Sequence, residues 1–215
     1  MVDKETFLDA VLAHVVFDGW SRTAMDAAAN ELGVDAAQLK ALFARGPVDM
    51  ALAWHERGDR EMIARMKATD MEGMRYRDRI ALGVRLRLEG GDKELVRRAM
   101  ALFALPQYAP LGSPAIWGTA SHIWQALGDT SRDINWYTKR ATLSAVYSAT
   151  ILFWLGDESE GDSATWEFLD RRIDDVMQIE KVKGRLRDTG LFQAFMRGPG
   201  RLFEHVHAPH ERSGK

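Results

Sequence analysis

The sequence predicts an all-α protein, and three observations support this fold class. Apolar residues recur with a helical period of about 3.6 along nearly every segment. Alternating runs of β-branched residues, which would indicate strands, are absent. Glycine and proline fall between the helical segments, where they mark turns, most clearly at 90–91, 106–114 and 156–163.

The first 70 residues predict a series of short helices with their own start and stop signals. Ser21 or Thr23 caps the second helix, and Asp35 caps the third. A fourth helix begins at Gly46-Pro47, and the pair Gly58-Asp59 predicts a break in it. The helices predicted here run over residues 4–17, 23–32, 36–43, 47–57 and 60–69.

The remaining helices are longer, and one of them is unusual. They are predicted at 76–89, 93–105, 113–127, 135–155 and 164–187. The segment 141–156 carries no charged residue, yet at 16 residues it is shorter than the about 20 that a membrane span needs, and serine and threonine interrupt it. Large apolar residues line one side of it and small residues the other. We therefore expect a helix packed inside protein on both sides.

Composition excludes several classes of protein. The net charge is −2, so nothing global indicates a nucleic acid or an acidic surface as partner. There is no cysteine, which excludes disulfides and thiol catalysis. The start, MVDKETFLDA, has neither the basic nor the apolar region of a signal peptide. We expect the protein to stay in the cytoplasm.

Catalytic and metal-binding patterns are weak. No nucleophile with a base, no phosphate-binding glycine loop and no carboxylate–histidine metal motif stands out. The pattern His205-x-His207-x-x-His210 lies in a polar tail without other metal ligands nearby. We expect no enzyme activity, no cofactor and no metal.

The stretch "FLDAVLAHVVFDGWSRTAMDAAANELGVDAAQLKALF" resembles the N-terminal DNA-binding domain of TetR-type regulators. A TetR-type transcription regulator with a small apolar ligand is therefore one hypothesis. A recognition helix needs side chains suited to bases and phosphates. Here only Gln38 and Lys40 qualify, with Arg45 beyond, and Asp35 would repel phosphate. We expect no nucleic acid to bind.

The stretch "DINWYTKRATLSAVYSATILFWLGDES", followed by "TWEFLDRRIDDV", resembles the Coq-nine family of ubiquinone-biosynthesis proteins. This resemblance implies a TetR-like fold, a homodimer, and binding of an isoprenoid quinone precursor or phospholipid. It also implies a non-catalytic role beside the demethoxy-ubiquinone hydroxylase or another ubiquinone-pathway enzyme, and a position at the inner membrane. The expected organisation is a helix-turn-helix-like lobe at 1–46, a lipid-binding and dimerisation lobe at 47–187, a membrane helix at 188–206 and a tail at 207–215.

The first residues of the stretch "DINWYTKRATLSAVYSATILFWLGDES" form the expected partner surface. The resemblance assigns contact with the hydroxylase to Asp133, Trp136, Tyr137 and Arg140. Tryptophan, tyrosine and arginine supply most of the energy at interfaces. The alternative is that Asp133 or Asn135 caps a helix whose Trp136 packs inward.

Two apolar stripes are candidates for lipid contact. One stripe consists of bulky residues beside small ones at 113–127, and the other is the side of 141–156 that carries large apolar residues. Each stripe can line a ligand cavity or belong to the ordinary hydrophobic core. The expected lipid-binding residues are Ile116, Trp117, Trp124, Leu143, Tyr147 and Ile151. 

A basic, apolar stretch follows residue 180, and it suits an amphipathic helix on an anionic membrane surface. Gly198-Pro199-Gly200 would end that helix early. The alternative is a last helix packed on the body or on a second subunit. The expected membrane-binding residues are Leu191, Phe192, Phe195, Met196 and Arg197.

Overall fold

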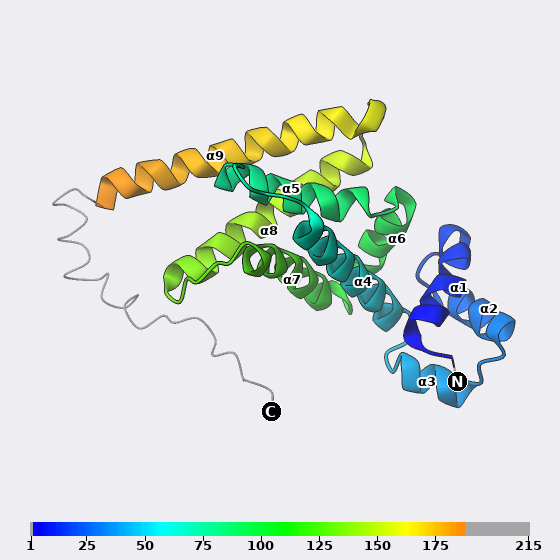
Figure 1. Ribbon diagram of the computed structural model, residues 1–215. Coiled ribbons are helices and arrows are strands. Elements are labelled where there is room, and N and C mark those ends of the chain that lie inside the picture. The colour runs from blue at the N-terminus through cyan, green and yellow to red at the C-terminus, as the bar shows by residue number, and fades with distance from the viewer. Residues whose placement is uncertain (1, 188–215) are drawn as a thin grey trace. The chain divides into compact units, whose positions relative to one another are not determined.

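The computed structural model describes residues 2–187, in which helices are joined by turns and short loops (Figure 1). Residues 2–187 contain no strand, so the predicted all-α class is confirmed. The helices in order are α1 Lys4–Asp18, α2 Arg22–Leu32, α3 Ala36–Leu42, α4 Pro47–Ala68, α5 Tyr76–Glu89, α6 Lys93–Phe103, α7 Ala109–Ala126, α8 Ile134–Leu155, the short 3₁₀ helix η1 Glu160–Asp162 and α9 Ser163–Arg187.

The chain divides into two compact units. One consists of Met1–Asp70 and Gly83–Thr119, and the other of Met71–Leu82 and Ala120–Lys215, of which the structure describes residues up to 187. Helices α5 and α7 each cross from one unit to the other along their length. The units therefore do not coincide with the lobes expected at 1–46 and 47–187.

The first three helices begin where local hydrogen bonds favour a helix. Asp35 accepts the backbone N–H of Gln38 at 2.8 Å, and the side chain of Gln38 accepts the N–H of Asp35 at 3.4 Å, which makes a capping box. Ser21 accepts from the backbone of Ala24 at 3.2 Å, so Ser21 is the cap of α2. Gly33 ends α2 with φ of 65°, a left-handed conformation that glycine adopts without steric cost.

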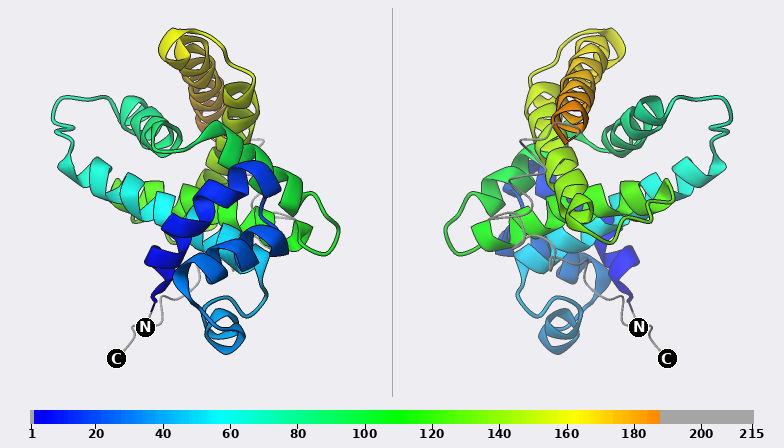
Figure 2. Two further views of the ribbon diagram at one scale, coloured as in Figure 1. Left: turned by 90° about the vertical axis from the view of Figure 1, so that its right-hand side faces the viewer. Right: turned by 90° about the vertical axis from the view of Figure 1, so that its left-hand side faces the viewer.

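Apolar side chains of these helices form the core of the first unit. Phe7 on α1 and Phe43 after α3 are both almost fully buried, with ring centroids 5.3 Å apart. Trp20 packs on Trp54 at 5.4 Å and donates its indole N–H to the carbonyl of Leu95. Helices α1 and α2 lie side by side in all views (Figure 2).

Helix α4 corrects one prediction. The break expected at Gly58-Asp59 does not occur, and α4 is continuous from Pro47 to Ala68. Asp59 is only 3% exposed and accepts from Arg87 Nε at 2.8 Å and from Thr119 Oγ1 at 2.9 Å. A Cβ added at Gly58 would lie 2.8 Å from Arg87 Cζ. The glycine therefore makes room for a buried ion pair and does not end the helix.

Helix α7 corrects a second prediction. It begins at Ala109, and Pro110 and Pro114 are helical residues, so the connection after α6 spans only 104–108. Pro110 occupies the first turn, where its missing N–H costs nothing. Pro114 deprives the helix of a single hydrogen bond, to the carbonyl of Pro110.

Helices α8 and α9 are neighbours in the second unit (Figure 1). The side of α8 that carries Leu143, Tyr147 and Trp154 is buried, as predicted. Residues 2–187 leave the opposite side uncovered, since Ala145 is exposed and Leu152 is 61% exposed. No helix in the described part of the chain has the length and apolar character of a membrane span.

The turn between α8 and α9 is fixed by Asp157. Its carboxylate accepts from the backbone and the hydroxyl of Thr165, at 2.8 and 2.6 Å, and from the backbone of Ser159. These hydrogen bonds, from Thr165 first, lower the pKa of Asp157 well below its usual range. Asp157 therefore joins the end of α8 to the start of α9 and fixes the length of the turn between them.

Candidate functional site

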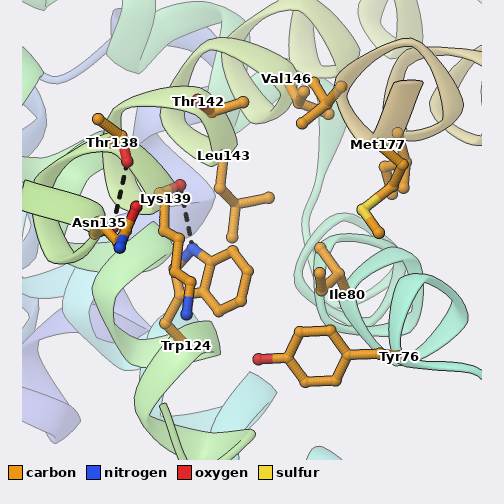
Figure 3. A pocket seen from close by; sticks show the side chains of 12 residues that line it. Tyr76, Ile80, Trp124, Asn135, Thr138, Lys139, Thr142, Leu143, Val146 and Met177 are labelled. Atoms are coloured by element: carbon orange, nitrogen blue, oxygen red, sulfur yellow. Dashed lines mark hydrogen bonds between the residues drawn. The ribbon is translucent and has the colours of Figure 1, made fainter. Parts of the chain in front are cut away.

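A mainly apolar pocket of about 210 Å³ lies within the second unit (Figure 3). The start of α5, the end of α7, and helices α8 and α9 all contribute to its wall. Its lining residues are Tyr76, Ile80, Trp124, Asn135, Thr138, Lys139, Thr142, Leu143, Val146, Ile173, Val176 and Met177.

The body of the pocket is apolar because one face of α8 meets α5 and α9 there. Leu143 and Val146 lie three residues apart and so share a helical face. Ile80 and Ile173, from α5 and α9, are 5% and 4% exposed. Such a wall offers burial to an apolar ligand.

Polar atoms gather at one edge of the pocket, at the start of α8. Lys139 Nζ donates to Asp129 Oδ1 and to Ser131 Oγ, each at 2.7 Å. The same ammonium group lies 5.2 Å from the ring centroid of Trp124, whose indole N–H donates to the carbonyl of Lys139 at 3.1 Å (Figure 3). These contacts fix both Lys139 and Trp124 in the wall.

The phenol of Tyr76 lies across the pocket from these groups, with its ring centroid 5.9 Å from that of Trp124 (Figure 3). Partial burial raises the pKa of Tyr76 above its usual value. The hydroxyl therefore keeps its proton at neutral pH and can donate a hydrogen bond to a ligand.

Asp129 is the charge that organises this edge. Its side chain is 2% exposed, and burial alone would raise its pKa. Hydrogen bonds from Lys139, Ser131 and Arg140 outweigh the burial and lower the pKa of Asp129 to about 2. Sequence reasoning missed this residue, because it lies in the connection between the helices predicted at 113–127 and 135–155. The adjacent Lys139-Arg140 pair, which needs a counter-ion once buried, was the available signal.

Arg140 lies behind the expected partner surface. It is 1% exposed, and its guanidinium donates to Asp129 Oδ2 at 3.1 Å, to the carbonyl of Trp136 at 3.0 Å and to Ser121 Oγ at 3.1 Å. Arg140 therefore supports the surface from within and does not present its charge at it.

The other three residues of that surface are accessible. Asp133 is exposed and caps α8 by accepting the N–H of Asn135 at 3.1 Å, so the capping alternative also holds. Trp136 and Tyr137 are half-buried, and their rings meet edge to face with centroids 4.8 Å apart. An aromatic pair beside an acidic cap thus remains available for contact.

Two of the six expected lipid-binding residues, Trp124 and Leu143, line the pocket. Tyr147 and Ile151 are buried on α8 outside its lining, and Ile116 and Trp117 belong to the other unit. Sequence reasoning missed the contributions of α5 and α9, which no local pattern connects to α8. Those residues are Tyr76, Ile80, Ile173, Val176 and Met177.

The predicted membrane-binding residues fall outside the described part of the chain, and so does the histidine pattern of the tail. They are Leu191, Phe192, Phe195, Met196 and Arg197, and His205, His207 and His210. Within residues 2–187 no group of three or more histidine and acidic side chains is placed to hold a metal ion.

The arrangement of helices defines the class of protein. A solved structure of a TetR transcriptional regulator from Nitrosomonas europaea superposes with a TM-score of 0.65 over 80% of this chain and 95% of that one. Because the two sequences are 18% identical, this likeness establishes a TetR-like fold only. The predicted fold is thereby confirmed.

The sequence comparisons show similarity to one family. Residues 109–180 match the model of the COQ9 family. A ubiquinone biosynthesis protein COQ9 from Drosophila melanogaster is 30% identical over 200 residues, which are 90% of this chain and 60% of that protein. Proteins of the same kind from Dictyostelium discoideum and Homo sapiens are 28% identical over 86% and 87% of this chain. The chain is similar to these proteins over most of its own length, and it spans 60–63% of theirs.

Proposed function

We propose that this protein is a non-catalytic accessory protein of ubiquinone biosynthesis that binds an isoprenoid quinone precursor and presents it to a pathway enzyme. The observation that carries the proposal is the apolar pocket between α5, α8 and α9. Most of its wall lies inside the segment that matches the COQ9 family model, and the relatives named above are ubiquinone biosynthesis proteins. The mainly apolar wall of this pocket suits binding and transfer of a ligand better than chemistry on it.

The size of the pocket limits what it encloses. At about 210 Å³ it is smaller than the roughly 300–1,000 Å³ of pockets that enclose a whole drug-sized ligand. It has room for a ring and the first part of a tail, and the rest of a long isoprenoid chain would leave through the opening. A phospholipid would fit in the same way, by one acyl segment.

The proposed partner is the demethoxy-ubiquinone hydroxylase or another hydroxylase of the pathway. Asp133, Trp136 and Tyr137 reach the surface next to Asn135 and Lys139, which line the pocket. An enzyme bound to this surface would meet the polar edge of the pocket directly. This proximity supports transfer between the two proteins without passage through water.

Homodimer formation and membrane attachment complete the proposal. The uncovered face of α8 offers the small side chains of Ala141 and Ala145 and the apolar side chain of Leu152 to the α8 of a second copy. The basic, apolar stretch around Phe192 would hold the dimer at an anionic membrane surface such as the inner membrane. Sedimentation would report the dimer, and flotation with anionic liposomes would report the attachment, which Phe195→Asp should abolish.

Extraction of lipid from the purified protein tests the central claim. Mass spectrometry should detect an isoprenoid quinone precursor or phospholipid in about stoichiometric amount after gentle purification. If the protein carries no lipid and takes up none from vesicles that contain prenylated quinone, lipid binding is refuted.

A TetR-type regulator is the second candidate, favoured by the helix-turn-helix-like arrangement of α2 and α3. The charge on α3 opposes it, since Asp35 places a carboxylate at the helix end where a phosphate would bind. A gel shift with genomic fragments at physiological salt separates the two candidates. Sequence-dependent binding at nanomolar concentration would promote the regulator.

A further inference from the structure

The polar edge of the pocket, at the start of α8, contains a donor suited to one end of a ligand. We propose that Lys139 is the head-group contact of the pocket and selects ligands with an oxygen acceptor, such as a quinone carbonyl, a phenolate or a carboxylate. The tail of the ligand then lies toward α9. This inference rests on the proposed function and adds the orientation and the chemistry of the bound molecule.

Lys139 has a hydrogen-bond donor to spare. An ammonium group has three N–H donors. One is directed to Asp129 and one to Ser131, both at 2.7 Å, which leaves a third. The side chain is 35% exposed and lines the pocket, so this donor can reach a ligand there. Asp129 and Ser131 also fix the position of the ammonium group before a ligand arrives.

The neighbouring charges favour an acceptor over a cation. Asp129 is the nearest carboxylate, but its side chain is 2% exposed and is already shared by Lys139 and Arg140. Tyr76, across the pocket, keeps its hydroxyl proton and can donate as well (Figure 3). A ligand with an amine at its end would meet Lys139 as a like charge.

The distribution of lining residues sets the orientation. Asn135, Thr138 and Lys139 lie on the first turns of α8, and Leu143 and Val146 lie further along it. From α9 the pocket receives only apolar side chains, those of Ile173, Val176 and Met177. The head of the ligand would therefore lie within one helical turn of Trp136 and Tyr137, and the tail would lie away from them.

A pair of matched ligands tests the inference on the full chain. Geranyl-benzoquinone and geranylbenzene share the tail and a six-membered carbon ring, and only the quinone carries carbonyl oxygens that can accept a hydrogen bond. The wild-type protein should prefer the quinone, and Lys139→Met should reduce this preference by about tenfold or more, because a hydrogen bond to a charged donor is lost. Affinity for geranylbenzene should stay within about threefold. Arg132→Met, an exposed position outside the lining, is the control.

The outcomes separate this inference from the proposed function. If the wild type binds neither ligand, the proposed lipid binding fails. If the wild type binds both and Lys139→Met keeps the full preference for the quinone, the role of Lys139 is refuted and lipid binding stands. Because each variant is compared with both ligands, a general loss of stability cancels in the ratio. Lys139→Arg, which retains charge and donors, should keep the preference, and its loss there would contradict the inference.

Discussion

The guanidinium carbon of Arg140 lies 4.1 Å from the ring centroid of Trp136. This stacking joins a surface aromatic residue to a fully buried cation, which Asp129 holds from the other side at 3.1 Å. A desolvated cation–π contact of this kind contributes about 2 kcal/mol. The surface proposed for partner binding is therefore supported by a charge network inside the second unit.

Arg140→Met should destabilise the protein by about 3 kcal/mol, because it removes one partner of a buried ion pair. Lys139 and Ser131 remain beside Asp129 and keep the loss from being larger. Urea unfolding followed by circular dichroism measures the change. Arg132→Met, which alters an exposed arginine nearby, should change stability by less than about 0.5 kcal/mol. Equal stability of Arg140→Met and wild type would contradict the network.

The low pKa of Asp129 predicts a specific dependence of stability on pH. Because the folded-state pKa is about 2 and lies below the ordinary value of 3.8, the carboxylate stabilises the fold at pH above about 4. That stabilisation, about 2 kcal/mol, is lost as the pH falls from about 4 to about 2. Asp129→Asn should lose stability at neutral pH, and its unfolding free energy should approach that of wild type below pH about 2. A constant difference across this range would exclude the assignment.

Two glycine substitutions should have opposite effects on stability. Gly58→Ala places a Cβ 2.8 Å from the guanidinium of Arg87, which Asp59 and His55 hold in place. We expect a net loss of about 1–3 kcal/mol, as in other overpacked sites. Gly118→Ala meets no atom within 4 Å and lies inside α7, so it should stabilise by about 0.5–1 kcal/mol. Thermal unfolding of both variants measures the contrast, and a stabilised Gly58→Ala would show that Arg87 moves aside freely.

Val146→Trp should close the pocket. Val146 is 7% exposed and lines the cavity between α8 and α9. An indole there would occupy much of about 210 Å³, so uptake of prenylated quinone should fall by more than about tenfold. The cost in stability should stay near 1–3 kcal/mol. Glu167→Trp, at an exposed position of α9 outside the pocket lining, should bind lipid like wild type. Normal uptake by Val146→Trp would mean that the lipid binds elsewhere.

Trp136→Ala and Tyr137→Ala should each weaken binding to the hydroxylase by at least about 2 kcal/mol, a typical effect of interface hot spots. Both side chains are half-buried, so folding should suffer less than in Arg140→Met. Titration calorimetry or a pull-down with the purified enzyme measures the effect. Glu167→Ala, an exposed position on α9, serves as control. Wild-type affinity in both aromatic variants would remove this surface from consideration.

Local signals were sufficient to predict most of the fold. The caps Ser21 and Asp35 predicted the starts of α2 and α3, because each acts through a hydrogen bond to a backbone N–H three residues further on. The apolar period of α8 predicted which side is buried. The resemblance to COQ9 proteins came from the same helix.

Features that depend on distant residues were not predictable in this way. Gly58 looked like a helix break because the residue that requires it, Arg87, is 29 positions away. The role of Asp129 depends on two side chains of the next helix, and only their basic pair, ten residues further on, indicates that a counter-ion is needed. The pocket wall joins α5 to α9, and only the folded chain brings these helices to one cavity.

Because the chain leaves the first unit after Asp70, returns at Gly83 and leaves again after Thr119, the pocket-bearing unit is not one continuous stretch. A fragment limited to the family match at 109–180 would lack Tyr76 and Ile80 and would open the pocket to water. Recombination that exchanges one contiguous gene segment could not transfer this binding unit by itself. The two units must therefore be inherited together, and an isolated lipid-binding module would require circular permutation or a new linker in place of 83–119.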